Sequence, residues 1–517
     1  MIFKRHGHLP APLAASLLLA LALLVYTVIR AVKVGFTHDE SSSFMNLIHE
    51  PVQALFFSAR NWQAANNHLT NTICMQIGYH FFGAAEWALR WGSLLGGLLF
   101  LIYAFRIVRL WLPVASWHFF GAFCIFTLNH FVIDFFSLAR GYGLCLAFEM
   151  AALYYLFRWI KQEVPTEAVT GLDNRSTTMF KAGDLLKAGC ALGAGVLSNF
   201  TLLDLMAAFF VTVTVVFYAK HKSHFAFASW LRLITPPALP ALITMGLIFQ
   251  PMRWIQAKGE FEYGPQAFWE TWRVLVERFV YNPCPAYLWI KVVILGVATL
   301  LFLLLGYAIF RRFRNTQLSE NSTRYVCYAA LLTVLTMGMT MLQHYLLGAN
   351  YLIGRTALLF YPLLSSVVVL YLLDLPKRMA YFHKSTLLWP VIPALLIVNF
   401  CSHANLRFAQ EWRYDENTRA AVLLASQQSD APHVISYGVG WLYYSTTLFY
   451  QEVLKLDNIK VAYNASHDDL SWVTSQPFDL IYIDPALQPK VEDDYVLIKK
   501  YPQGVMMRSK RLIPNAD

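Results

Sequence analysis

Long apolar runs separated by short polar segments dominate the chain as far as residue 401. The first run, residues 11–32, is close to the roughly 20 residues that an α-helix needs to cross a bilayer. Counting apolar stretches of this length gives about eleven predicted membrane spans. The predicted spans are residues 11–32, 89–112, 117–135, 144–159, 188–197, 202–218, 231–249, 288–310, 326–345, 356–373 and 387–401.

Clusters of lysine and arginine set the direction in which the predicted spans run. Lys4 and Arg5 precede the first span, and residues 220–222, 311–314 and 377–378 separate later spans. If successive spans cross the membrane in opposite directions, all of these clusters lie on the same side of the membrane. Positive charge favours the cytoplasmic side. The N-terminus is therefore predicted to be cytoplasmic. The odd number of spans places the C-terminal part outside.

Composition indicates a membrane protein and argues against other classes. Hydrophobic residues make up 57% of the 517 residues and charged residues 14%, well below the roughly one quarter that soluble domains carry. Because topology explains the basic clusters, the net charge of +10 does not indicate nucleic-acid binding. The seven cysteines have no metal-ligand spacing, and no disulfide is predicted from them. The expected location is a bacterial inner membrane, crossed many times.

Two regions between the spans depart from the pattern of long apolar runs. Residues 44–82 are only partly apolar, and their apolar residues have helix-like spacing. This is typical of amphipathic helices that lie on a membrane surface, within a first external loop of residues 33–85. A second sizeable external loop is predicted at residues 250–287.

After residue 402 the pattern becomes that of a small α/β domain. Residues 433–438, 459–463 and 479–484 are short apolar runs predicted as buried strands, and residues 416–428 and 441–454 are predicted helices. This alternation favours a small open sheet, and no glycine-rich phosphate loop opens either helix. The predicted organisation is a mainly α, polytopic helical bundle over residues 1–402, followed by an extracytoplasmic α/β domain over residues 403–517.

An acidic pair follows the first span directly, because Asp39 and Glu40 lie just outside the predicted membrane boundary. Adjacent residues diverge on a helix or a strand. Both can face one pocket only if the backbone there is a turn, which His38 and the following serines favour. A paired acid in this position suits general-base catalysis or cation binding. The alternative is a solvated loop with two ordinary surface acids.

Further polar residues are predicted to meet this acidic pair at the outer ends of the spans. Arg140 and Arg355 lie on the side that basic residues normally avoid. They are either interface anchors or an anion site, because guanidinium groups suit phosphate. Glu86 and Arg90, four residues apart, are predicted to pair along a helix. The polar groups are Asn66, Asn67 and His68, Arg140 with Tyr142, and Arg355 with Tyr351.

Five segments share an order and spacing with a known family. The segments are Phe36-Thr37-His38-Asp39-Glu40, Asn67-His68-Leu69, Gly83-Ala84-Ala85-Glu86-Trp87-Ala88-Leu89-Arg90, Phe136-Ser137-Leu138-Ala139-Arg140-Gly141-Tyr142 and Gly354-Arg355-Thr356. Together they resemble the C-type glycosyltransferases (GT-C), and among them the protein O-mannosyltransferase and aminoarabinose-transferase group. The resemblance covers residues 1–220 best. Phe136 stands where that group usually has tyrosine, and the acid often found before its Ala-Arg is absent.

The resemblance implies an enzyme that transfers a hexose or pentose from a polyprenyl-phosphate donor to an extracytoplasmic glycan, lipid or protein, with inversion. Asp39 would be the general base, a role that typically contributes about 10²–10⁴-fold. Glu40 would orient the acceptor or hold a cation. Arg355 and Arg140 would bind the leaving phosphate. Asn67, His68, Tyr142 and Tyr351 complete the predicted substrate site, and Lys258 and Tyr263 would close over the lipid head.

Two other functions and one metal site stay open. A transporter or flippase for lipid-linked substrates would place polar groups at mid-membrane depth, on broken helices in inverted repeats. A polymerase or ligase of lipid-linked glycans would carry a large late external loop rich in arginine and histidine, for which residues 250–287 are a weak candidate. No motif requires a cofactor. A divalent cation held by Asp39, Glu40 and His68 is left open.

Overall fold

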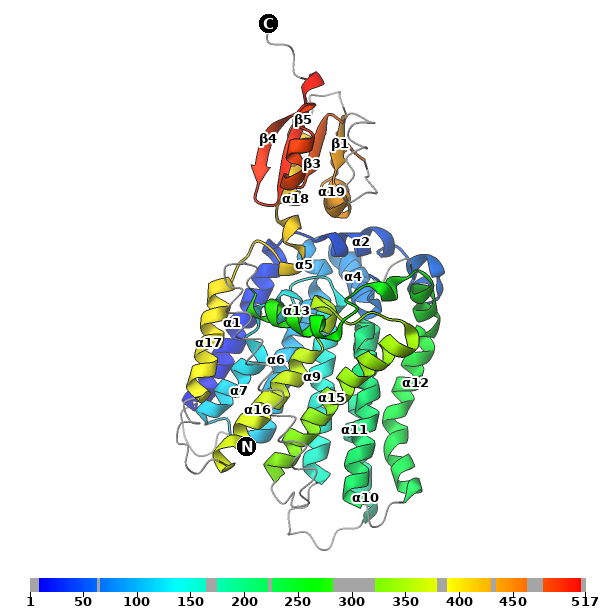
Figure 1. The fold of residues 1–517 in the computed structure, drawn as a ribbon, viewed down its shortest axis with the longest axis vertical. Coiled ribbons are helices and arrows are strands. Elements are labelled where there is room, and N and C mark those ends of the chain that lie inside the picture. The colour runs from blue at the N-terminus through cyan, green and yellow to red at the C-terminus, as the bar shows by residue number, and fades with distance from the viewer. Residues whose placement is uncertain are drawn as a thin grey trace.

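The computed structural model describes residues 9–62, 66–163, 174–221, 226–281, 321–378, 388–428, 434–462 and 478–512. These residues form a bundle of helices that carries a small β-sheet at one end (Figure 1). The predicted fold class, a mainly α polytopic bundle followed by a small α/β unit, is confirmed.

Six helices in the described part of the chain are long and apolar enough to cross a membrane: α1 (Ala11–Lys33), α6 (Trp91–Trp111), α9 (Gly141–Glu163), α11 (Leu203–His221), α12 (Phe227–Ala257) and α15 (Asn321–Leu347). Three shorter apolar helices are α7 (Trp117–Thr127), α16 (Phe360–Arg378) and α17 (Leu388–His403). A further helix, α10 (Asn174–Ser198), packs against α9 and α12 and covers the predicted span at 188–197. The predicted span at 288–310 lies outside the described residues.

Helix α1 shows how a span meets both protein and lipid. Leu18 and Leu21 are 66% and 57% exposed, whereas Leu23 and Arg30 face the bundle and are buried. Arg30 is buried together with Asp134 of α8 (His130–Asp134), and its Nη2 lies 2.6 Å from Oδ1 of that residue. A buried charge without a partner is costly. This ion pair therefore holds the C-terminal end of α1 against α8.

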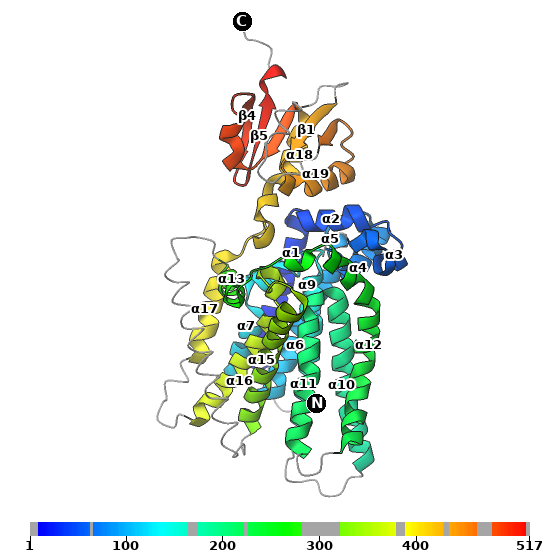
Figure 2. The same ribbon diagram turned by 45° about the vertical axis from the view of Figure 1, so that its right-hand side comes forward.

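Four short helices lie between α1 and α6, at the end of the bundle that carries the sheet (Figure 2). They are α2 (His38–Leu47), α3 (Val52–Phe57), α4 (Leu69–Phe82) and α5 (Glu86–Leu89). Helix α4 does not show the predicted amphipathic pattern, because apolar side chains lie on both its buried and its exposed face. Leu69 and Met75 are buried, while Ile77 and Phe81 are exposed.

The acidic pair belongs to a helix rather than to the predicted turn. Helix α2 begins at His38, and Thr37 is its N-cap. The Glu40 carboxylate accepts a hydrogen bond from the backbone N–H of Thr37 at 2.9 Å. This is the hydrogen bond of a capping box in which the N3 side chain bonds the backbone of the N-cap residue, and a capping box favours a helix start. The prediction of a turn overlooked the Thr-x-x-Glu signal, and it is wrong.

Where the structure describes it, the C-terminal unit contains two α-helices, α18 (Thr418–Gln427) and α19 (Trp441–Val453), and five strands, β1 (Ile435–Val439), β2 (Ile459–Ala462), β3 (Leu480–Ile483), β4 (Tyr495–Tyr501) and β5 (Gly504–Ser509). The strand order is β2-β1-β3-β5-β4. Strand β1 pairs in parallel with β2 and β3, and β5 and β4 add an antiparallel edge. The three predicted strands and both predicted helices are present. The sequence pattern does not predict β4, in which Lys499 and Lys500 interrupt the apolar alternation, or β5.

Helix α19 packs on α2 (Figure 2). The ring of Phe449 stacks on Phe36 with centroids 4.2 Å apart. The Tyr450 hydroxyl accepts a hydrogen bond from the backbone N–H of Phe36 at 2.7 Å and donates one to Glu86 at 3.0 Å. The C-terminal unit is thus held against the segment that carries the acidic pair.

Candidate active site

Asp39 and Glu40 point away from each other in the first turn of α2. Successive helical residues are about 100° apart, so one carboxylate faces a cavity and the other faces the protein interior. Asp39 lines the cavity and is 7% exposed. Glu40 is fully buried, and its oxygens accept hydrogen bonds from Nε and Nη2 of Arg90 at 2.8 and 2.7 Å. The predicted roles of Glu40 in orienting the acceptor or holding a cation do not fit this position.

Two arginines from distant parts of the chain face Asp39. Its Oδ2 lies 3.3 Å from Nη2 of Arg140, which directly precedes α9. The same oxygen lies 3.5 Å from Nη2 of Arg355, in the turn η5 (Gly354–Ala357) before α16. Arg140 is buried and also donates a hydrogen bond to Oδ1 of Asn66 at 3.0 Å. The structure thus brings together the acid and the two arginines that the sequence places at one end of the spans.

Burial and charge act in opposite directions on Asp39. Burial by itself would raise the pKa of the carboxyl group, because the anion loses hydration. The guanidinium groups of Arg140 and Arg355 outweigh burial and hold the pKa of Asp39 below its usual value. Asp39 is therefore an anion at neutral pH, as a general base must be. The same two cations make it a weak base while no other anion is present.

The cavity beside Asp39 has a volume of about 730 Å³ and two kinds of wall. One wall is polar, and the other is formed by apolar side chains of α12 and α15, including Met252, Ile255 and Leu347. The volume falls within the roughly 300–1,000 Å³ of small-molecule sites. The predicted site residues that line the cavity are Asp39, Asn67, His68, Arg140, Tyr142, Tyr263 and Arg355.

Besides Glu40, two predicted site residues do not line this cavity. Tyr351 is buried, and its ring stacks on His344 with centroids 4.3 Å apart. Lys258 is the C-cap of α12, and its side chain is exposed outside the cavity wall. Tyr263 from the same loop does reach the site, since its ring centroid lies 5.5 Å from the guanidinium carbon of Arg355.

One ring nitrogen of His68, Nε2, has no hydrogen-bond partner among the residues that the structure describes. Its Nδ1 lies 3.1 Å from the carbonyl oxygen of Ser198, and since a carbonyl only accepts, Nδ1 carries the proton. Nε2 is then a buried acceptor with no hydrogen-bond partner among the described residues. Burial, and next the charge of Arg140, lower the pKa of His68 well below its usual value, so the ring stays neutral. Gly141 permits this packing, because a Cβ there would lie 1.9 Å from the Ser198 oxygen.

The predicted cation ligands do not converge. Glu40 points away from the cavity and has both carboxylate oxygens on Arg90, so it cannot join Asp39 and His68 in a ligand set. Across the ranges that the structure describes, no three histidine, cysteine, aspartate or glutamate side chains come together as a metal site.

A segment after the last span contributes residues that sequence analysis missed. The segment η7 (Gln410–Asn417) supplies part of the cavity wall. The Glu411 carboxylate lies 3.4 Å from Nη1 of Arg355 and 3.2 Å from Nε of Arg278, in α13 (Phe268–Val280). The ring centroid of Trp412 lies 5.2 Å from the guanidinium carbon of Arg355 and 6.0 Å from that of Arg140, within range of cation–π attraction. No local motif signals these roles.

Asp415 gives the junction between η7 and α2 a measurable pH dependence. Its Oδ2 accepts a hydrogen bond from the backbone N–H of His38 at 2.6 Å. Burial raises the pKa of Asp415 to about 8, against roughly 4 in an unfolded chain. The folded protein therefore keeps a proton that the unfolded chain releases, and the corresponding stability is lost as pH rises from about 4 to about 8. We expect the unfolding temperature in detergent to fall over this range, and to fall less in Asp415→Asn. If the unfolding temperature falls equally with pH in the native chain and in Asp415→Asn, the raised pKa of Asp415 is contradicted.

No family model matches the chain, and no curated protein matches it. Solved structures similar to it include ArnT from Cupriavidus metallidurans bound to undecaprenyl phosphate, at 13% identity over 95% of this chain and 97% of that chain, with a TM-score of 0.47. The archaeal oligosaccharyltransferase AglB from Archaeoglobus fulgidus, in complex with an inhibitory peptide and a dolichol-phosphate, is similar at 11% identity over 96% of this chain and 75% of that chain, with a TM-score of 0.40. Values at this level describe a distant likeness.

Proposed function

We propose that this chain is a membrane glycosyltransferase of the GT-C type. It would take a hexose or pentose from a polyprenyl-phosphate carrier and transfer it, with inversion, to a glycan, lipid or protein acceptor. The observation that carries the proposal is the Asp39 carboxylate between Arg140 and Arg355, in a cavity with one polar and one apolar wall. A base, a site for phosphate and a surface for a lipid tail then lie within reach of one bound donor.

The apolar wall suits a carrier lipid. Ile255 of α12 and Leu347 of α15 line the cavity, and the end of α15 exposes Tyr345 and Leu346 at 79% and 70%. Aromatic side chains at the end of a span are typical of the membrane interface. A lipid tail beside these helices would leave its phosphate inside the cavity, where Arg355 supplies positive charge.

In the proposed reaction the acceptor hydroxyl attacks the anomeric carbon of the sugar while Asp39 takes the hydroxyl proton. A bond forms between the acceptor oxygen and the anomeric carbon. The bond from that carbon to the phosphate oxygen breaks, and the electron pair leaves with the lipid phosphate. Arg355 and Arg140 stabilise the charge that develops on this leaving group. Nε2 of His68, an acceptor without a partner among the described residues, would orient the attacking hydroxyl.

Donor binding would also strengthen the base. In the absence of donor, Arg140 and Arg355 both face Asp39 and lower its pKa. A phosphate that shares these guanidinium groups is a competing anion, so their hold on the carboxylate weakens and its basicity rises. Asp39 would thus become an effective base only when the donor is in place.

The same proposal places the cavity outside the cytoplasm of a bacterial cell. The cavity and the sheet lie at one end of the bundle, while Arg106, Arg158 and Lys161 lie toward the opposite ends of α6 and α9. Basic residues favour the cytoplasmic ends of spans. Because nucleotide sugars are cytosolic, a donor on the other side must arrive attached to a lipid.

Mass spectrometry of envelope components from cells with and without the protein tests this function. We expect one glycan, lipid or protein to lack a single hexose or pentose when the protein is absent. Transfer of a labelled sugar from a polyprenyl-phosphate donor by the purified chain is the second test. An unchanged envelope together with no transfer in vitro would refute the proposal.

Arg355→Gln is expected to weaken the binding of polyprenyl phosphate about 10- to 100-fold. The change removes charged hydrogen bonds worth roughly 1.5–3 kcal/mol. Titration of the purified chain in nanodiscs gives the Kd. Arg109→Gln is the control, because Arg109 is exposed in the last turn of α6, far from η5. An unchanged Kd in Arg355→Gln would show that the phosphate binds elsewhere.

A further inference from the structure

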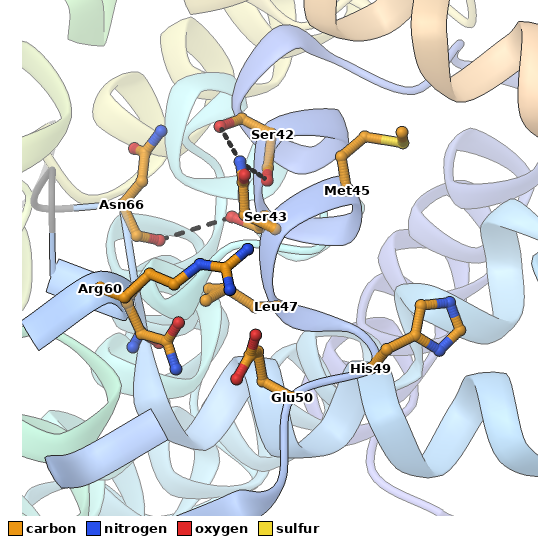
Figure 3. A pocket seen from close by; sticks show the side chains of 11 residues that line it. Ser42, Ser43, Met45, Leu47, His49, Glu50, Arg60 and Asn66 are labelled. Carbon is orange, nitrogen blue, oxygen red and sulfur yellow. Dashed lines mark hydrogen bonds between the residues drawn. The ribbon is translucent and has the colours of Figure 1, made fainter. Parts of the chain in front are cut away.

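We infer that a second cavity beside the first binds the saccharide part of a carbohydrate acceptor, an assignment that rests on the proposed glycosyltransferase function. This cavity, named here the α2 cavity, has a volume of about 490 Å³. It lies between α2 and the chain around Arg60 and Asn66 (Figure 3). The side chains that matter for its chemistry are Ser42, Ser43, Asn46, Glu50, Arg60 and Asn66.

One face of α2 connects the two cavities. Asp39, Ser42, Ser43 and Asn46 follow each other at helical spacing, so they share a face of the helix. Asp39 lines the first cavity, Ser43 and Asn46 line the α2 cavity, and Ser42 lines both. At about 1.5 Å per residue, this face extends roughly 10 Å from Asp39 to Asn46. A ligand of that length in the α2 cavity would reach the catalytic acid.

Asn66 lies across the α2 cavity from α2 and also contacts the surroundings of the catalytic acid. It lines both cavities, and its Oδ1 accepts a hydrogen bond from Arg140, whose guanidinium faces Asp39. Arg355 contacts Asp39 as well as Glu411. Asp39 would therefore lie within reach both of a ligand against Asn66 and of the donor phosphate assigned to Arg355 and Arg140. A general base in that position can take the proton of an acceptor hydroxyl that attacks the anomeric carbon.

The lining favours a carbohydrate over an alkyl chain or an extended peptide. Serine hydroxyls and asparagine amides both donate and accept hydrogen bonds, as sugar hydroxyls do. Arg60 and Glu50 point into the cavity in Figure 3, and neither has an ion-pair partner among the described residues. They supply one cation and one anion for polar groups of a ligand. The apolar lining consists of Met45 and Leu47, too little for the apolar pockets that peptides use.

Acceptor kinetics with the purified full chain test the assignment. The probes are an alkyl disaccharide and a serine-containing peptide, with a polyprenyl-phosphate donor labelled in its sugar. We expect Arg60→Gln and Glu50→Gln each to raise the KM for the disaccharide about tenfold, the usual loss for a charged hydrogen bond. The Kd for polyprenyl phosphate is expected to stay within about twofold. Arg109→Gln is the matched control. An unchanged KM, or a rise for the peptide alone, would overturn the inference.

A labelling experiment tests the same site without turnover. The thiol of an Asn46→Cys variant is modified with a maleimide, and the modified peptide is quantified by mass spectrometry. Excess alkyl disaccharide is expected to slow this modification at least threefold, and the peptide is not. Equal labelling with and without the disaccharide refutes the carbohydrate assignment. Failure of the proposed function would look different, because the native chain would then neither bind polyprenyl phosphate nor transfer its sugar.

Discussion

Asp39→Asn is expected to lower the rate of sugar transfer by roughly 10²–10⁴-fold, the usual loss when a general base is removed. The amide keeps the shape of the side chain but cannot take the acceptor proton. The change also removes the anion that faces Arg140 and Arg355. Polyprenyl phosphate is therefore expected to bind as tightly as before or more tightly. Single-turnover rates and donor Kd values from one preparation separate the two effects.

The matched control for this variant is Asp493→Asn, which makes the same chemical change at an exposed position after β3. It is expected to leave rate and donor affinity unchanged. A near-native rate of sugar transfer in Asp39→Asn would show that Asp39 is not the general base. The experiment also separates a transferase from a flippase, because a flippase with its site elsewhere would keep moving lipid in the Asp39→Asn variant.

Much of the fold follows from what a bilayer demands of a sequence. Backbone polar groups in lipid must be satisfied within a helix, so apolar length alone predicts the spans. Alternate threading then brings Asp39, Arg140 and Arg355 to the same end of the bundle, although more than 200 residues separate the two arginines. Short apolar runs also predict β1 and β3, because those strands are mostly buried, and β2, in which Ile459 is buried.

The sequence does not show which side chains meet once the ends of the spans are packed. Glu40 looks equivalent to Asp39, and only the helical geometry of α2 turns it toward Arg90. Arg90 does lie 3.8 Å from Glu86, as the i, i+4 spacing predicts, but Glu40 is closer at 2.7 Å. Trp412 could not be assigned either, since its position between two arginines depends on contacts with residues far away in the chain.

Arg90→Met is expected to destabilise the protein by about 3–5 kcal/mol, because it leaves the Glu40 carboxylate buried without a counter-ion. Arg90 also donates hydrogen bonds to the carbonyl oxygens of Ala31 and Val34 at 3.0 and 2.6 Å, at the end of α1. One guanidinium therefore ties the end of the first span to the start of α2. Denaturant unfolding in detergent, compared with Glu86→Gln as a control for a weaker and partly exposed contact, measures the loss. A small effect of Arg90→Met would contradict this role.

The double variant Glu40→Met with Arg90→Met separates charge burial from positioning. It removes both buried charges, so stability is expected to recover part of the single-variant loss. Its sugar-transfer rate is expected to stay low even where stability recovers. Without the pair, the guanidinium no longer links the carbonyl oxygens at the end of α1 to Glu40 in α2, and displacement of a catalytic group by about 1 Å is enough to cost roughly 10²-fold. Glu40 would then act through its neighbour: it positions Asp39 by holding the helix turn that both residues share.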